Sequence, residues 1–396
     1  MRKGGSGPRD RRGLGRSTGS ERPSRSGSAP DRGFRALQRG LTGDRSLIGV
    51  SYMDSPELLR AYLEFYWPIS FEQTRRALAV SALLSGVPAR VSRVIDAGSG
   101  PGPVAAAFAA AGATALSLLD QSPRALELAR ETIPSRIERA DGRPAPAIET
   151  VVCDIANPDP ARVPLWGTAD IVSFGHSLNE VASGRDDRVA VRASLLERYA
   201  TALAPGGSLL VIEPALLSTS RDLIALRNLL VSRGWRVLAP CVGRARLECP
   251  ALAAGESQTC HDEVRWTMPA SVERLAQSLA LDKESLKMTW FLFAPPGRDA
   301  APDAGETFRD ESSDDATVLR VVSEAMLNKA GRSRRLLCGE RGRFPLSALA
   351  GSAAAKDSGF DALARGSFVR VRNPEARENG WGVGPETTIE TIPVRS

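Results

Sequence analysis

The stretch VIDAGSGPG at residues 94–102 decides the fold of this chain. A short apolar run ends at Asp96, glycines follow at Gly98, Gly100 and Gly102, and a helical pattern comes next. Glycines at alternate positions allow a tight backbone turn and let a ligand approach the bare main chain. The stretch therefore predicts a strand, a turn that faces a ligand and a helix, an arrangement typical of α/β sheets.

Short apolar strands alternate with helical patterns from residue 93 onward. Because such alternation builds a parallel sheet with helices on both faces, the predicted fold class is α/β. The expected strands are 94–97, 115–119, 150–153, 171–174, 208–212, 235–238 and 288–294, and the expected helices include 122–132, 188–203, 221–233 and 270–280.

The spacing of the glycines distinguishes between nucleotide cofactors. A dinucleotide fingerprint needs its third glycine three residues after the second, where this chain has Pro103. The G-x-G-x-G form after an acid favours S-adenosylmethionine, which has no pyrophosphate. Asp120 ends the second strand, where a carboxylate can accept both ribose hydroxyls, and Asp154 follows the third strand near the adenine edge. An empty, structurally retained pocket is the alternative. We predict a class I, Rossmann-like S-adenosylmethionine-dependent methyltransferase core with these cofactor-binding residues: Asp96, Gly98, Gly100, Gly102, Asp120 and Asp154.

The segment after the fourth strand is where a methyl acceptor would lie. It contains His176 and Glu180, which are candidates for a general base and its orienting group, or for structural roles. Methylation of an exocyclic base nitrogen usually relies on Asn or Asp followed by two prolines and an aromatic residue, and this motif is absent. Methylation of a pyrimidine carbon needs a cysteine nucleophile, and none follows this strand. The sequence therefore indicates candidate catalytic residues but no methylated atom.

Three of the five cysteines, Cys241, Cys249 and Cys260, fall within 20 residues. The stretch that holds them is polar and irregular, so these thiols do not have the pattern of small core residues. Three thiolates leave one ligand position of a metal site open, for His261 or for a distant cysteine.

The distant candidate is Cys338, which lies in a segment rich in Lys and Arg. Four soft thiolates favour zinc or an iron-sulfur cluster. Paired C-x-x-C motifs are missing, so free thiols stay the alternative. The fifth cysteine, Cys153, lies on the apolar third strand, and we interpret it as a packed core residue.

Positive charge is concentrated at the start of the chain. The 396 residues include 52 Lys and Arg against 46 Asp and Glu, and residues 1–40 alone hold eleven basic and three acidic side chains. This tail is rich in Gly, Ser, Pro and Arg, so we predict that residues 1–40 are disordered and contact RNA. A solvated tail without a partner and a mitochondrial transit peptide are the alternatives.

Composition divides the rest of the chain into four further parts. The expected parts are a helical entry module at 41–92, a methyltransferase-like core at 93–297 with a cysteine insertion at 241–262, an acidic linker at 298–316 and a small β-rich unit at 317–396.

The helical entry module contains an aromatic cluster. We interpret this cluster as core rather than as a base-stacking platform; its members are Tyr62, Phe65, Tyr66 and Trp67.

No segment has the composition of a membrane span. Such a span needs roughly 18 consecutive apolar residues, and the first residues also lack the apolar core of a secretory signal. Five cysteines in a chain of this length do not suggest a disulfide framework. We therefore expect a soluble, cytoplasmic monomer without membrane contacts.

The order of the cysteine motifs behind the predicted core is specific. Over roughly residues 45–345 it resembles the small-ribosomal-subunit assembly methyltransferase-like family of mitochondria and bacteria. The stretches that carry this resemblance are the aromatic helical entry, 96–102, 177–181, 211–214, 238–241, 249–250, 260–261 and 338–339.

The resemblance implies a class I fold that can hold S-adenosylmethionine, and binding to small-subunit ribosomal RNA during assembly. It also implies a four-iron, four-sulfur (4Fe-4S) cluster on Cys241, Cys249, Cys260 and Cys338, with zinc as the alternative metal. We expect a ribosome-associated, methyltransferase-like protein. One rival is an active methyltransferase on RNA or a small molecule without a ribosomal role, and another is a redox or iron sensor that regulates RNA binding.

Overall fold

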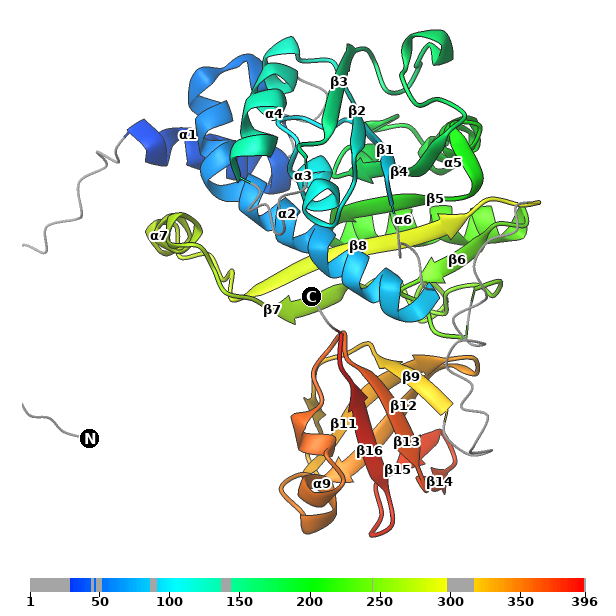
Figure 1. Ribbon diagram of the computed structural model, residues 1–396. Coiled ribbons are helices and arrows are strands. Elements are labelled where there is room, and N and C mark those ends of the chain that lie inside the picture. The colour runs from blue at the N-terminus through cyan, green and yellow to red at the C-terminus, as the bar shows by residue number, and fades with distance from the viewer. Residues whose placement is uncertain are drawn as a thin grey trace, which may run out of the picture.

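The computed structural model describes residues 29–43, 46–47, 52–85, 91–136, 144–243, 245–297 and 317–394. Figure 1 shows a large α/β core with the entry helices against it and a small β unit at one end. The acidic segment 298–316 and residues 1–28 lie outside the described residues.

The entry module begins earlier than predicted. Helix α1 covers Ala29–Gln38 and continues as a π-helical turn at Arg39–Gly43. Phe34 and Leu37 are fully buried, and the ring of Phe34 lies 4.3 Å from that of Phe65. The prediction that the whole of residues 1–40 is disordered is therefore wrong for this helix, because two large apolar side chains anchor it.

A 30-residue helix carries most of the entry module. A short 3-10 turn at Tyr52–Asp54 precedes helix α2, which covers Pro56–Ser85 and crosses one face of the core sheet (Figure 1). Its apolar side chains, among them Leu78 and Leu84, pack on the sheet together with helix α3. The helix therefore borders both the core sheet and, as shown below, the candidate site.

The core sheet has the strand order β3-β2-β1-β4-β5-β8-β6, with β7 paired to β8. The strands β1 to β5 are parallel neighbours, and β8 runs antiparallel between β5 and β6. The strands are β1 Arg93–Ala97, β2 Ala115–Asp120, β3 Ala147–Val152, β4 Ala169–Gly175, β5 Leu203–Pro214, β6 Arg236–Ala239, β7 Asp262–Arg265 and β8 Ser285–Ala294.

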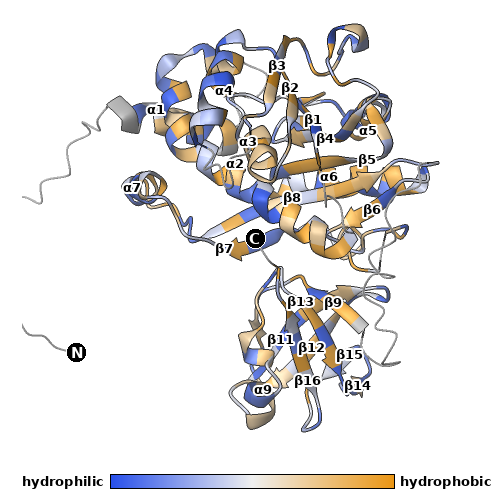
Figure 2. Cartoon of the chain, in the orientation of Figure 1, coloured by the Kyte–Doolittle hydropathy of each residue, from blue (hydrophilic) through white to orange (hydrophobic). Residues whose placement is uncertain are grey.

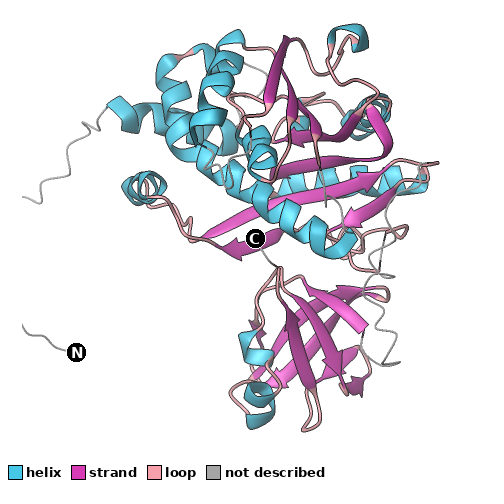
Figure 3. Ribbon diagram, in the orientation of Figure 1, coloured by secondary structure: helices cyan, strands magenta, loops and turns pink. Residues whose placement is uncertain are grey.

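Helices cover both faces of this sheet (Figures 1 and 3). Because side chains alternate along a strand, Val94 packs on the face under α2 and α3, whereas Ile95 packs on the face under α5 and α6. The core helices are α3 Pro103–Ala110, α4 Pro123–Arg136, α5 Arg188–Ala200, α6 Leu217–Ser232 and α7 Ala270–Ser278. The topology and layers confirm the predicted class I methyltransferase core. Strand β7, which begins at the last residue of the predicted cysteine insertion, was not predicted.

The C-terminal residues form a second sheet, of order β14-β15-β12-β11-β9-β13-β16, with β10 paired to β11. Its own core contains Leu337, Leu346, Phe360 and Val369, and apolar residues follow its strands in Figure 2. The elements are β9 Thr317–Val321, β10 Met326–Leu327, β11 Arg332–Gly339, β12 Gly342–Leu349, β13 Phe368–Arg372, β14 Glu375–Arg377, β15 Gly380–Gly382, β16 Thr388–Ile392, helix α9 Ala353–Asp357 and a 3-10 turn at Phe360–Ala362.

The β unit packs directly on the core. Val318 and Phe368 join the apolar cluster under α2, and Arg76 of α2 donates to the carbonyl oxygen of Gly366 at 3.2 Å. In the part of the chain that the structure describes, no helix is both long and apolar enough to cross a bilayer.

Candidate functional site

The glycine turn after β1 has the left-handed backbone that its sequence predicts. Gly98, Gly100 and Gly102 have φ of +73°, +51° and +76°. The indole N–H of Trp67 on α2 donates to the carbonyl oxygen of Pro101 at 3.0 Å. An added β-carbon at Gly98 would collide with the β-carbon of Ser177, which follows β4. The turn is therefore held from two sides, and only glycine fits at residue 98.

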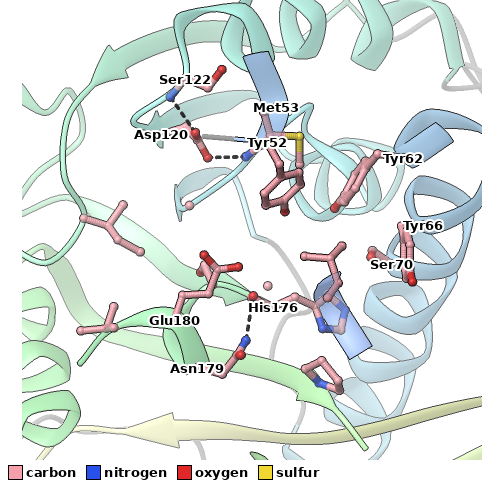
Figure 4. Close-up of a pocket in the computed structure, with 18 of the residues that line it drawn as sticks. Tyr52, Met53, Tyr62, Tyr66, Ser70, Asp120, Ser122, His176, Asn179 and Glu180 are labelled. Atoms are coloured by element: carbon pink, nitrogen blue, oxygen red, sulfur yellow. Dashed lines mark hydrogen bonds between the residues drawn. The ribbon is translucent and has the colours of Figure 1, made fainter. Parts of the chain in front are cut away.

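Asp120 fixes the same turn from the end of β2. Its carboxylate accepts the N–H of Gly100 at 2.8 Å and the N–H of Ser122 at 2.9 Å (Figure 4). Burial raises the pKa of Asp120, and the two backbone N–H groups oppose that shift. A carboxylate has about four lone-pair sites, so each oxygen can still accept a ligand hydroxyl.

A cavity of about 680 Å³ opens at the carboxyl ends of β1 to β5. Of the predicted cofactor residues, Gly98, Gly100, Asp120 and Asp154 line it. Asp154 is exposed, and its side chain accepts the N–H of Ala156 at 2.9 Å. The structure thus brings four of the six predicted residues to one cavity, at the edge where open α/β sheets bind ligands.

The other two predicted cofactor residues lie behind the turn. Asp96 is 1% exposed and accepts a hydrogen bond from the Ser173 hydroxyl at 2.7 Å, and an added β-carbon at Gly102 would press on Ile133 of α4. Neither is among the residues that line the cavity. Burial raises the pKa of Asp96 to about 7. From these positions, Asp96 and Gly102 support the glycine turn and do not contact a ligand in the cavity.

His176 lines the cavity in a strained conformation. Its φ is +62°, a region that residues other than glycine rarely adopt. Its Nε2 lies 2.8 Å from Oε1 of Gln73, whose amide nitrogen donates to the carbonyl oxygen of Lys287 at 3.0 Å. The amide orientation makes Nε2 the protonated nitrogen, because Oε1 can only accept. Burial lowers the pKa of His176 to about 4, so the ring is neutral at pH 7.

The predicted pairing of His176 with Glu180 differs from the one observed. Gln73 on α2, 103 residues away in sequence, holds Nε2, and Nδ1 is buried without a hydrogen-bond partner. Glu180 lines the cavity and turns toward it from the other end of the same loop (Figure 4). In this structure the hydrogen-bond partner of the imidazole is therefore Gln73, and the roles of His176 as general base and Glu180 as its orienting group stay a prediction.

A buried carboxylate holds the loop that carries both residues. Glu213, at the end of β5, accepts the backbone N–H of Asn179 at 2.9 Å and its side-chain amide at 2.6 Å. Glu213 is 2% exposed, and burial raises its pKa to about 8. The geometry of the loop thus depends on Glu213, which the sequence identified only as the end of a predicted strand.

The aromatic cluster of α2 divides between core and cavity. Phe65 and Trp67 are buried as predicted, but Tyr62 and Tyr66 line the cavity with ring centroids 5.9 Å apart. Tyr52, from the preceding turn, lines it as well (Figure 4). Sequence reasoning missed these residues and Gln73, because helical periodicity does not tell a core face from a cavity wall.

Cys153 is a second side chain with a mixed environment. It packs against the apolar cluster under α5 and α6, as predicted, but it is half-buried and also lines the cavity. Burial raises the pKa of its thiol. The interpretation as a purely core residue is therefore incomplete.

Cys241, Cys249 and Cys260 lie in the segment between β6 and β7. Burial, and after it the neighbouring thiols of Cys260 and Cys241, raise the pKa of Cys249 to about 12. The pKa of Cys260 is also raised, first by burial. All three side chains are half-buried against the same apolar cluster. The insertion thus brings these thiols close enough to interact electrostatically.

The fourth cysteine approaches the group from the β unit. An added β-carbon at Gly243 would lie 3.0 Å from the backbone nitrogen of Glu340, so the chain beside Cys241 touches the chain beside Cys338. Cys338 pairs in register with Arg320 of β9, which interacts electrostatically with Cys260 and Cys241. The two cysteine segments, far apart in sequence, therefore meet around one arginine.

The alternative ligand His261 already has a partner. Its Nε2 lies 2.6 Å from Nη1 of Arg365, and because arginine only donates, this nitrogen is an acceptor. Within the described ranges, no group of three or more His, Cys, Asp or Glu side chains has the arrangement of a metal site.

Comparison with known proteins places the chain in a family. The family model described as mitochondrial small ribosomal subunit Rsm22 matches residues 60–349. A comparison with curated protein sequences gives no match.

Similar solved structures are methyltransferases. The plantazolicin methyltransferase BpumL in complex with SAH is 13% identical, with a TM-score of 0.34, covering 68% of this chain and 100% of that chain. The ribosomal protein L11 methylase from Lactobacillus delbrueckii subsp. bulgaricus is 12% identical, with a TM-score of 0.31, covering 56% and 77%.

Asp96 makes the stability of the fold depend on pH. Its folded pKa is about 7 against an ordinary 3.8, so between these values the folded chain keeps a proton that the unfolded chain has lost. Stability from this group is therefore complete at low pH and is lost as the pH rises to 7. Asp96→Asn mimics the protonated form, and its unfolding free energy relative to the wild type should rise by on the order of 4 kcal/mol across this window.

Urea denaturation at pH 4, 5.5, 7 and 8.5 measures this difference. His176, whose pKa is lowered, titrates with the opposite sign below its ordinary pKa of 6.5 but cancels in the comparison of the two proteins. Asp186→Asn, at an exposed position, is the control for the change from Asp to Asn. A difference for Asp96→Asn that changes with pH no more than that of the control would contradict the buried, protonated Asp96.

Proposed function

This chain belongs to the Rsm22 family, described as mitochondrial small ribosomal subunit Rsm22, and from that premise we propose that it is a ribosome-associated, methyltransferase-like protein. It binds S-adenosylmethionine in the cavity and an iron-sulfur cluster on four cysteines, and it contacts the RNA of the small ribosomal subunit. The observation that carries the cofactor proposal is the cavity at the strand ends, where the glycine turn, Asp120 and Asp154 meet.

The cavity suits an adenosyl cofactor in volume and polarity. Its 680 Å³ lies within the usual range of about 300–1,000 Å³ for small-molecule sites. Asp120 offers acceptor sites to the ribose hydroxyls, and Asp154 offers a carboxylate farther along the same edge. Tyr52 and Tyr62 supply apolar ring surface. Asp96 and Gly102 support the turn from behind.

A second candidate function is methyl transfer itself. The neutral imidazole of His176 can accept a proton, and Gln73 leaves Nδ1 as the basic nitrogen. Glu180 supplies a carboxylate on the same loop. This proposal needs an acceptor in the same cavity, and the cofactor experiment below tests it too.

Gly98→Ala should abolish tight binding of S-adenosylmethionine. The added methyl group displaces Ser177, which lines the cavity, and a left-handed alanine costs about 1–2 kcal/mol. We expect the affinity measured by calorimetry to fall by roughly tenfold or more. Gly184→Ala is the matched control, because Gly184 has a similar φ of +82° and open space around it.

Equal loss of affinity in both variants would show general strain and contradict this site. Methyl transfer from labelled cofactor to RNA in an extract, if the wild type has this activity, should disappear in Gly98→Ala and persist in Gly184→Ala.

The cluster proposal is supported by the convergence of thiols. Cys241, Cys249 and Cys260 interact electrostatically, and the chain beside Cys338 touches the chain beside Cys241. Thiolates are the ligands that iron-sulfur clusters use. When bound, the cluster would supply four ligand bonds between the insertion and the β unit.

Anaerobically purified protein should contain roughly four iron and four sulfide per chain. Cys338→Ser should lose most of both, since it removes the ligand that the β unit supplies. Cys153→Ser is the matched control and should retain the wild-type content, because Cys153 lies at the cavity and not with the other thiols. Zinc in place of iron would support the alternative metal, and equal content in both variants would exclude Cys338 as a ligand.

The RNA proposal is supported by charge on the face of the β unit that carries Cys338. Arg332 and Arg334 lie on the same side of β11 as Cys338, since alternate residues share a face. Arg343 pairs with Cys338 in register on β12. Such arginines are suited to phosphate contacts, which supply most of the affinity for nucleic acid. We propose a cytoplasmic monomer, although the family description is mitochondrial.

Sedimentation with 30S precursors at rising salt tests this proposal. Binding should weaken as salt rises, and the double variant Arg334→Ala with Arg343→Ala should reduce the salt slope by about 2. The control is Arg124→Ala with Arg130→Ala, which removes the same charge from exposed positions on α4. Association that does not respond to salt, or equal slopes for both double variants, would contradict RNA binding by this face.

A further inference from the structure

A buried group of charges lies where the β unit meets the core. Asp262 of β7 is 2% exposed and Arg320 of β9 is 4% exposed. Nη2 of Arg320 lies 3.3 Å from one carboxylate oxygen of Asp262, and Nε of Arg76 lies 3.9 Å from the other. Two guanidinium groups therefore share a single carboxylate in the interior.

Around Asp262, the two positive charges of Arg76 and Arg320 exceed the single negative charge of the carboxylate. The neighbouring Arg365 faces another carboxylate, Glu263, at 3.8 Å, and Glu263 is shared with Lys287 at 3.1 Å. Charges buried without compensation are costly, so a second arginine at Asp262 requires another anion nearby. The thiols of Cys260 and Cys241 also interact electrostatically with Arg320.

Arg320 also has an unused donor. Its Nε is buried and has no hydrogen-bond partner. The residue lies opposite Cys338 in the pairing of β9 with β11. One side chain thus lies between the cysteine of the β unit and the cysteines of the insertion, with an N–H group available for a further acceptor.

We propose that Arg320 is the positioning counter-ion of an anionic metal–thiolate centre formed by Cys241, Cys249, Cys260 and Cys338. Four cysteines that lose their protons on binding a metal supply the negative charge that the buried group lacks. The Nε–H of Arg320 donates to a sulfur of that centre, while Nη2 keeps the ion pair with Asp262. This inference rests on the proposed cluster and assigns a role to a residue that is not a ligand.

The counter-ion role of Arg320 differs from that of an ion pair that only joins the core and the β unit. An arginine that only pairs with Asp262 would affect docking of the β unit and nothing at the metal. A counter-ion also stabilises the extra electron of a reduced centre, so its loss lowers the reduction potential. The potential is therefore a readout that a merely structural role would not move.

The test compares Arg320→Met, Arg320→Lys and Arg370→Met in the anaerobically purified full chain. Arg370, on β13, is the matched control: its Nε is also buried without a partner, its ion pair is with Glu390, and it lies opposite Val318 rather than opposite a cysteine. Iron, sulfide and zinc content, metal loss to a chelator and the reduction potential are measured. Thermal unfolding of the metal-free proteins checks that each variant folds.

Arg320→Met should lose metal to the chelator about 10- to 100-fold more readily than the wild type, and its remaining cluster should have a lower reduction potential. Arg320→Lys keeps the charge without the Nε donor, so its potential should stay near that of the wild type while its metal retention is intermediate. If Arg320→Met fails to fold, Arg320→Lys still tests the role of Arg320. Arg370→Met should match the wild type.

Two results would overturn the inference in distinguishable ways. A wild-type chain without any metal removes the proposed cluster and the role of Arg320 together. A loaded wild type whose retention and potential are unchanged in both Arg320 variants removes only the role of Arg320 and leaves the cluster in place.

Discussion

The carboxylate of Asp262 is the interaction on which the arrangement of the molecule depends. It lies within ion-pair distance of Arg76 from α2 and Arg320 from β9, and it accepts the indole N–H of Trp290 from β8 at 3.3 Å. One buried group thus joins the entry helix, the core sheet and the β unit. Because Asp262 comes two residues after Cys260, the same contacts bring the cysteine insertion to the β unit.

Helix α2 connects the two candidate sites. Gln73 holds the imidazole of His176 at the cavity, and Arg76, less than one turn farther along, contacts Asp262 and Gly366 at the junction. A rigid helix transmits displacement along its length, so the position of the β unit and the shape of the cavity depend on a common element. The proposed cofactor and the proposed cluster would then stabilise the same arrangement of parts.

Much of this arrangement could be predicted from the sequence, because local patterns determine it. The glycine turn at 98–102 and the acids at Asp120 and Asp154 follow apolar strands, and parallel strands bring their ends to one edge. What the sequence could not show depends on partners distant along the chain. Nothing in the spacing of α2 indicates that Gln73 meets His176 or that Tyr62 faces a cavity. The helix at 29–38 depends on burial of Phe34 against Phe65, which composition alone does not reveal.

We propose that thiolates from two distant segments, 97 residues apart from first to last, hold one iron-sulfur centre at the junction of core and β unit. Iron K-edge X-ray absorption of the anaerobically purified chain tests this proposal. We expect iron surrounded by sulfur alone, with iron neighbours at the short separation of a cluster. Iron bound by oxygen and nitrogen ligands, or a chain that carries no iron, would contradict it.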